Sequence, residues 1–253
     1  MWLGALAAGM AAGSLSGMFG IGGGIILVPV LGTLLGLDQH QAQGISLATM
    51  LPPLGLPAVL HYRQAGHRIR WGLVGYLLLG FLGGVAGGAL LANAIPNRPL
   101  RWGFVTFLLL MAARFLWASR SRGLLPVRPE PSQRRQVLGG LLIGLVGGLL
   151  SGLLGIGGGA VIIPLLAVGM GLAQHEAQVT SLALMLPPIG LPGVLVYARG
   201  HELPWMVLLW AGLGYTAAAL VGARFATRLR GHALQGFFAG LLVVLAALLA
   251  LKA

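Results

Sequence analysis

Two short runs of polar residues carry the chemistry that this sequence offers. In each run a histidine, a glutamine and a serine are spaced three residues apart, so they lie on adjoining turns of one helix surface. The runs are His40, Gln43 and Ser46 in the first half of the chain, and His175, Gln178 and Ser181 in the second half. Neutral hydrogen-bond donors of this kind suit an oxyanion that must bind and then leave. We therefore predict that the glutamines and serines bind a small anionic substrate.

Each of these residues could instead have a structural role. The serines could form hydrogen bonds between packed helices. The histidines titrate near neutral pH, which favours a role in gating or proton handling. Because His40 and His175 begin their segments, they could equally cap a helix at the water interface.

A run of glycines precedes each polar run and could bind the same anion through the backbone. A glycine-rich turn that opens a helix presents unpaired N–H groups at the positive end of the helix dipole. The predicted substrate-binding glycines are Gly22, Gly23, Gly24, Gly157, Gly158 and Gly159. No lysine or threonine follows them, which argues against a nucleotide-binding loop. The alternative role is close helix packing, which glycine also permits.

The glycine and polar runs belong to a stretch that occurs twice. Residues Ser16–Tyr62 and Ser151–Tyr197 are 135 positions apart and share more than half of their residues, which indicates an internal duplication. Glycine and proline interrupt helices, and polar side chains are costly in hydrocarbon, so their repetition in apolar surroundings needs a functional reason. Paired, interrupted segments in two halves are typical of a transporter's binding site.

Prolines repeat in the same way and are predicted to break helices. A proline inside a helix leaves the carbonyl four residues earlier without its hydrogen bond. At membrane depth such carbonyls need water, a substrate or neighbouring hydroxyl groups as partners. The predicted breaks are Pro29, Pro52, Pro53 and Pro57, and in the second half Pro164, Pro187, Pro188 and Pro192.

The composition places the chain in a lipid bilayer. Hydrophobic residues make up 57% of it and charged residues 8%, whereas soluble proteins have about 25% charged residues. The net charge of +12 would suggest nucleic acid in a soluble chain, but the arginines lie in short connections, where they set membrane orientation. The absence of cysteine excludes disulfides and thiolate metal sites. We expect no nucleic-acid partner, no metal and no cofactor.

The predicted fold class is all-α: a polytopic integral membrane protein with two homologous halves of about four to five helical segments each. Residues 1–118 and 137–253 form the two transmembrane repeats, and 119–136, rich in arginine and proline, form a cytoplasmic linker. Segment 1–19 lacks a basic leader and is expected to remain as a first helix. Segments 25–36 and 160–171 are too short to cross about 30 Å of hydrocarbon and are predicted to be re-entrant or tilted. Segments 40–62 and 175–197 are each predicted to be two half-helices.

The arginines give a weak indication of how the halves are related. Five crossings per half would place about twelve basic residues on one side and four on the other, against about eleven and five for four crossings. Inverted repeats are therefore slightly favoured over parallel ones.

The repeated pattern resembles the TauE/SafE sulfite exporter family of membrane permeases. The resemblance rests on Gly20–Gly24 with Pro29 and His40–Ser46, and on Gly155–Gly159 with Pro164 and His175–Ser181. The family often has Gly-Thr-Ser where this chain has Gly44-Ile45-Ser46 and Val179-Thr180-Ser181, so each half keeps part of that motif. The resemblance implies a multi-pass protein of the bacterial inner membrane. It also implies transport of a small sulfur-containing or organic anion such as sulfite, sulfoacetate or thiosulfate.

Three functions are compatible with these features. The leading hypothesis is a secondary transporter, and not an enzyme, with its substrate between the two broken-helix motifs. A passive anion channel also needs a lined path. An intramembrane serine hydrolase would use Ser16 or Ser151 with His40 or His175, but it would need one such pair rather than two. The direction of transport, the coupling ion and the oligomeric state stay open, and a homo-oligomer is one compatible arrangement.

Overall fold

The computed structural model of the chain describes residues 2–19, 23–52, 56, 59, 69–120, 132–226 and 231–251. The regular structure in these residues is α-helical, in eleven helices, which confirms the all-α prediction. The first half contains α1 (Trp2–Phe19), α2 (Gly24–Leu34), α3 (Gln39–Thr49), α5 (Trp71–Ala94) and α6 (Asn97–Arg120). The second half contains α7 (Gln133–Leu154), α8 (Gly159–Met170), α9 (Gln174–Leu184), α10 (Leu191–Gly200), α11 (Trp205–Ala226) and α12 (Gly231–Ala250).

The long helices have the length and surface of membrane spans. Within the described residues, α5, α6 as far as Trp117, and α7 are long and apolar enough to cross a bilayer. The 24 residues of α5 correspond to about 36 Å, more than the hydrocarbon thickness of about 30 Å. Large apolar side chains such as Leu79, Leu90 and Leu142 are exposed on these helices, as expected where a helix meets lipid. The chain is therefore a polytopic membrane protein.

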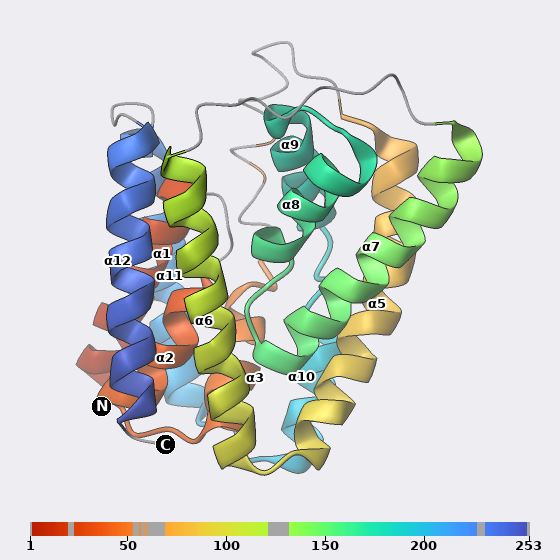
Figure 1. Cartoon of the computed structure of the whole chain (residues 1–253). Coiled ribbons are helices and arrows are strands. Elements are labelled where there is room, and N and C mark those ends of the chain that lie inside the picture. The colour runs from red at the N-terminus through yellow and green to blue at the C-terminus, as the bar shows by residue number, and fades with distance from the viewer. Residues whose placement is uncertain are drawn as a thin grey trace.

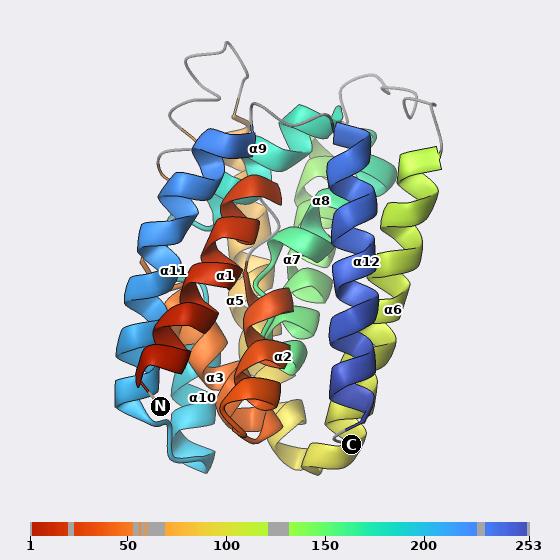
Figure 2. The same cartoon turned by 90° about the vertical axis from the view of Figure 1, so that its left-hand side faces the viewer.

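Shorter helices occupy the interior between the long ones. The helices α2, α3, α8, α9 and α10 have 10 to 12 residues each, which is only about 15–18 Å. In both views α2 and α3 lie in the lower part of the molecule and α8 and α9 in the upper part (Figures 1 and 2). Helix α2 packs against α3, and α8 packs against α9. The two short segments that were predicted to be re-entrant or tilted thus lie toward opposite ends of the molecule.

The third segment of the second half is broken as predicted. Helix α9 ends at Leu184 and α10 begins at Leu191, with Pro187 and Pro188 in the interval. Pro192 is in the first turn of α10, where a missing N–H costs little. The six described helices of the second half thus form five segments, one of them broken in two. In the first half α3 ends at Thr49 and Pro52 follows it, whereas Pro53 and Pro57 lie outside the described residues.

The other two predicted breaks are different. Helices α2 and α8 continue through Pro29 and Pro164, so neither proline ends its helix, contrary to the prediction. Each ring removes a single backbone donor, which frees only the carbonyl four residues earlier and leaves the other helical bonds in place. The chain turns at glycine instead: Gly155 ends α7 with φ of +68°, a left-handed conformation that favours glycine.

Glycines allow the long helices of the two halves to pack backbone to backbone. Helix α1 lies along α11, α5 along α7, and α6 along α12, so each pair joins one helix from each half. A Cβ atom added at Gly9 would overlap the carbonyl of Ala211, and one at Gly144 would overlap the carbonyl of Leu77. Close approach through small residues is the usual packing device of membrane helices.

Helices at corresponding positions of the two halves run in opposite directions. Helix α6 rises from its connection with α5 at the bottom of Figure 1, whereas α12 descends to the C-terminus. Helix α5 descends and α11 rises, and α1 rises whereas α7 descends (Figures 1 and 2).

Candidate functional site

The two glycine runs meet in the interior of the molecule. A Cβ atom added at Gly24 would lie 2.7 Å from the Cα of Ile156, so the start of α2 abuts the segment that follows α7. The Ser46 hydroxyl donates to the Gly155 carbonyl at 2.7 Å. The Cα of Gln43 also lies against Gly155. The structure therefore brings Gly24, Gln43 and Ser46 together with the second glycine run, whereas Gly22 lies outside the described residues.

The glycine runs place two helix N-termini at this meeting point. Helix α2 starts after Gly23 and α8 after Gly158, and neither of these N-cap residues has a side chain that could bond the first turn. The first N–H groups of a helix have no intrahelical partners and carry the positive end of its dipole. Such ends attract anions when they are shielded from water.

An aromatic ring covers each glycine run, and the two rings differ by one hydroxyl group. The Gly23 N–H donates to the Tyr215 hydroxyl at 2.8 Å, and Tyr215 in turn donates to the Ser16 hydroxyl at 2.7 Å. In the second half the ring against Gly158 is Phe81, whose Cε2 would lie 2.6 Å from a Cβ added at that glycine. Phenylalanine has no hydroxyl to offer.

Tyr215 and Phe81 are missing from the residues predicted from sequence, although the sequence contains a signal for them. Comparison of the halves beyond Tyr62 pairs Trp71, Gly80 and Phe81 with Trp205, Gly214 and Tyr215, at a separation of 134 rather than 135. The one-residue difference ends the continuous match, so the aromatic pair falls just beyond the repeated stretch.

A small cavity lies beside the second glycine run. Its walls include Phe81, Ser151, Gly157, Met50 and Met185, and its volume is about 10 Å³, the room of one water molecule. The Ser151 side chain is 1% exposed, and its hydroxyl has no hydrogen-bond partner among the described residues. The corresponding Ser16 hydroxyl accepts a bond from Tyr215.

The polar face of α3 is tied to the second half through Tyr197. The Tyr197 hydroxyl lies 2.8 Å from Gln43 Oε1 and 2.7 Å from the Gly152 carbonyl, although one proton can serve only one of these oxygens. Within the described chain the Nε2 of Gln43 has no partner. Tyr197 is the last residue of the repeated stretch, and the sequence pattern predicts no role for it.

The predicted residues of α9 are placed less completely. Ser181 and its neighbour Thr180 are buried, and neither hydroxyl has a partner in the part of the chain that the structure describes. Gln178 is half-buried on the same helix. The backbone of His175 is in the first turn of α9, but its side chain lies outside the described residues.

His40 is buried and does not cap its helix. Asp38 caps α3 and forms a capping box with Gln41. The His40 ring is 3% exposed, with Nδ1 2.7 Å from Asn97 Oδ1 and Nε2 2.9 Å from the Ala92 carbonyl. The side chain therefore holds α3 against the corner between α5 and α6, and its role in gating stays a prediction.

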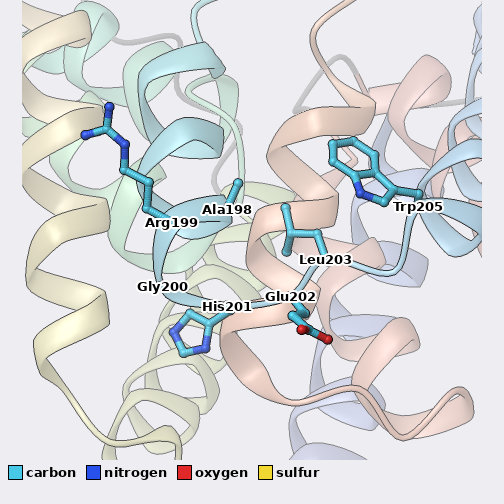
Figure 3. A pocket seen from close by; sticks show the side chains of 7 residues that line it. All are labelled: Ala198, Arg199, Gly200, His201, Glu202, Leu203 and Trp205. Carbon is cyan, nitrogen blue, oxygen red and sulfur yellow. The ribbon is translucent and has the colours of Figure 1, made fainter.

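An open pocket lies next to His40 at the lower end of the molecule. It has a volume of about 510 Å³ and is lined by the connection from α10 to α11, residues 198–205. In Figure 3 His201 and Glu202 lie on the lower side of this connection, whereas Arg199 points away from them. The His201 ring stacks on the His40 ring at 4.3 Å. Partial burial, and then the charge of His40, lower the pKa of His201, while Asp38 acts to raise it.

Among the described residues, the interior site contains no fully charged side chain. The buried polar side chains of the described chain are glutamines, serines and threonines together with His40. Neutral donors and helix dipoles of this kind can bind an anion and release it again.

Comparisons with known proteins agree with the membrane architecture. Residues 5–249 match the family model described as "Sulfite exporter TauE/SafE". The chain is similar to a "Probable membrane transporter protein" of Haemophilus influenzae, with 28% identity over 98% of this chain and 97% of that protein. It is also similar to a protein of the same description from Xylella fastidiosa, with 29% identity over 92% and 88% of the two chains. No solved structure gives a significant match. The chain therefore belongs to the TauE/SafE sulfite exporter family of membrane transporters.

Proposed function

We propose that the chain is a secondary transporter that carries a small anion across the bacterial inner membrane. A sulfur-containing oxyanion or an organosulfonate, such as sulfite, is the proposed substrate class. The observation that carries this proposal is the meeting of two helix N-termini that begin at glycine, those of α2 and α8, beside buried neutral donors. This arrangement suits an anion because the helix dipoles attract it and the donors replace its hydration.

We further propose that the two halves are inverted repeats. The opposite directions of α1 and α7, of α5 and α11, and of α6 and α12 support this relation (Figures 1 and 2). The placement of the pairs α2–α3 and α8–α9 toward opposite ends supports it as well. In transporters built this way, the halves rock around a site near the middle of the bilayer. Each of the pairs α1–α11, α5–α7 and α6–α12 joins one helix from each half. A movement of one half would therefore also move the helices of the other half.

The site geometry favours a transporter over the two other functions. The cavity beside Ser151 holds about one water, whereas a passive channel needs a continuous path. The hydrolase needs a serine bonded to a histidine. Ser16 is bonded to Tyr215, and His40 lies against Asn97 and Ala92.

We propose that the upper end of Figure 1 faces the cytoplasm. Helix α6 ends there, and α5 and α7 begin there. The arginines at these three helix ends are Arg70, Arg120, Arg134 and Arg135. Short cytoplasmic connections carry an excess of basic residues, which supports this orientation.

Uptake of labelled anions by proteoliposomes tests the proposed function. Purified protein is reconstituted into vesicles, which are exposed to radiolabelled sulfite, thiosulfate, sulfate or acetate, with empty vesicles as the control. We expect saturable uptake of at least one sulfur oxyanion. Uptake that equals the empty-vesicle background for all four anions would refute the proposal.

A further inference from the structure

The two glycine runs are equivalent in sequence but differ in what lies against them. We propose that the anion binds at a single site, at the N-terminal end of α8 beside Ser151, and that Tyr215 closes the equivalent place in the first half. This inference rests on the proposed function and specifies where the substrate sits.

In the first half an oxygen atom of the protein fills the place beside the helix N-terminus and the serine. The Tyr215 hydroxyl accepts the Gly23 N–H at 2.8 Å and donates to Ser16 at 2.7 Å. One oxygen atom thus bonds both the N–H of the N-cap residue of α2 and the serine hydroxyl. Because this oxygen belongs to the protein, no oxygen of a substrate can take its place while Tyr215 remains there.

The second half has the equivalent helix N-terminus, serine and aromatic ring, but it lacks the hydroxyl oxygen. Phe81 lies against Gly158 but offers no hydroxyl to its N–H. Ser151 lines the adjoining cavity and is 1% exposed, and its hydroxyl has no partner in the described part of the chain. An unpaired buried hydroxyl is costly to the folded protein, so a donor kept in this state beside a helix N-terminus indicates a ligand.

The geometry defines the ligand by its chemistry. An oxygen that takes the place corresponding to the Tyr215 hydroxyl would accept from Ser151 and lie at the positive end of α8. The remaining oxygens of a small oxyanion need more room than the cavity of about 10 Å³ provides. Met50 and Met185 form part of its wall, and methionine side chains adapt readily. The ligand is therefore a small oxyanion that enters as these side chains move.

A matched pair of serine variants tests the inference. The purified full-length chain is titrated with sulfite, thiosulfate, sulfate and acetate, and binding is measured by calorimetry and by the rise in melting temperature. Ser151→Ala removes a hydrogen bond to a charged ligand, which weakens binding about tenfold or more. Ser16→Ala removes the same group at the equivalent place and should leave the Kd within about twofold of wild type.

The aromatic pair provides an independent test. Phe81→Tyr adds a hydroxyl where Gly158 and Ser151 can bond it, so binding should be lost while the melting temperature of the ligand-free protein rises. Tyr215→Phe should retain binding. If Phe81→Tyr does not fold, the serine pair alone decides.

The outcomes separate this inference from the proposed function. Weakened binding in Ser151→Ala but not in Ser16→Ala supports a single site at α8. Equal effects of the two serine variants, or wild-type binding by Ser151→Ala, would overturn the single site at α8. Uptake of an anion by proteoliposomes with the wild-type protein would still support transport. If wild-type protein neither binds nor takes up any of the four anions, both proposals fall.

Discussion

Ser46→Ala should destabilise the protein at the junction between its halves. The Ser46 side chain is fully buried, and its hydroxyl donates to the Gly155 carbonyl at 2.7 Å. Helix α3 of the first half is thereby joined to the end of α7. The substitution removes this bond and leaves a buried carbonyl without it.

The magnitude follows from the place of the bond. Hydrogen bonds between membrane helices are worth about 0.6 kcal/mol on average and up to about 1.7, and an unsatisfied buried acceptor costs about 1–3 kcal/mol. We expect a loss of about 1–2 kcal/mol in the free energy of unfolding. For a chain of this size that corresponds to a melting temperature lower by about 2–8 °C.

The second half provides a matched control. Ser181 is the corresponding residue of α9 and is 1% exposed, but its hydroxyl has no partner among the described residues. Ser181→Ala should therefore change the melting temperature by less than about 2 °C. Tryptophan fluorescence in detergent, at one scan rate because membrane proteins often unfold irreversibly, measures both variants. Equal losses in the two variants would refute the reasoning.

Three further predictions concern packing, pH and orientation. A Cβ atom at Gly84 would overlap the Leu145 carbonyl, whereas nothing lies within 4 Å of one at Gly87. Gly84→Ala should therefore lower the melting temperature by several degrees and Gly87→Ala should not, and a similar loss in both would contradict the packing. The pKa of His201 is lowered from 6.5, so the unfolded chain binds this proton more readily and stability should fall as the pH drops below about 6.5. Melting curves from pH 5 to 8 should show a smaller fall for His201→Gln, and an unchanged profile would exclude this contribution. Alkaline phosphatase fused after Pro129 should be inactive and after Glu202 active, because the linker is expected in the cytoplasm, and the reverse pattern would invert the topology.

Much of the fold was predictable because the signals were local. Apolar runs of the right length marked the long helices, and runs too short to span marked α2 and α8. The break between α9 and α10 followed from Pro187 and Pro188. The prediction that Pro29 and Pro164 break their helices was wrong, because the helical bonds continue on either side of each proline.

The candidate site was predictable only in part because its contacts join distant residues. The duplication pointed to the glycine runs and to Gln43 and Ser46. It did not show that Tyr215 lies on Gly23, 192 residues away in sequence, or that His40 faces Asn97 rather than water. Such pairings depend on how α1 packs along α11 and how α3 meets the α5–α6 corner, which periodicity within one segment does not encode.

Counterflow in proteoliposomes tests the central claim, transport of a small anion by a carrier, most directly. Vesicles are loaded with unlabelled sulfite and diluted into trace labelled sulfite, with Ser151→Ala and empty vesicles alongside. A carrier that binds the anion on alternate sides should produce a transient accumulation of label above equilibrium, reduced in Ser151→Ala. Label that only equilibrates would indicate a passive channel, and label that stays at the level of empty vesicles, for sulfite and for thiosulfate, would contradict the account.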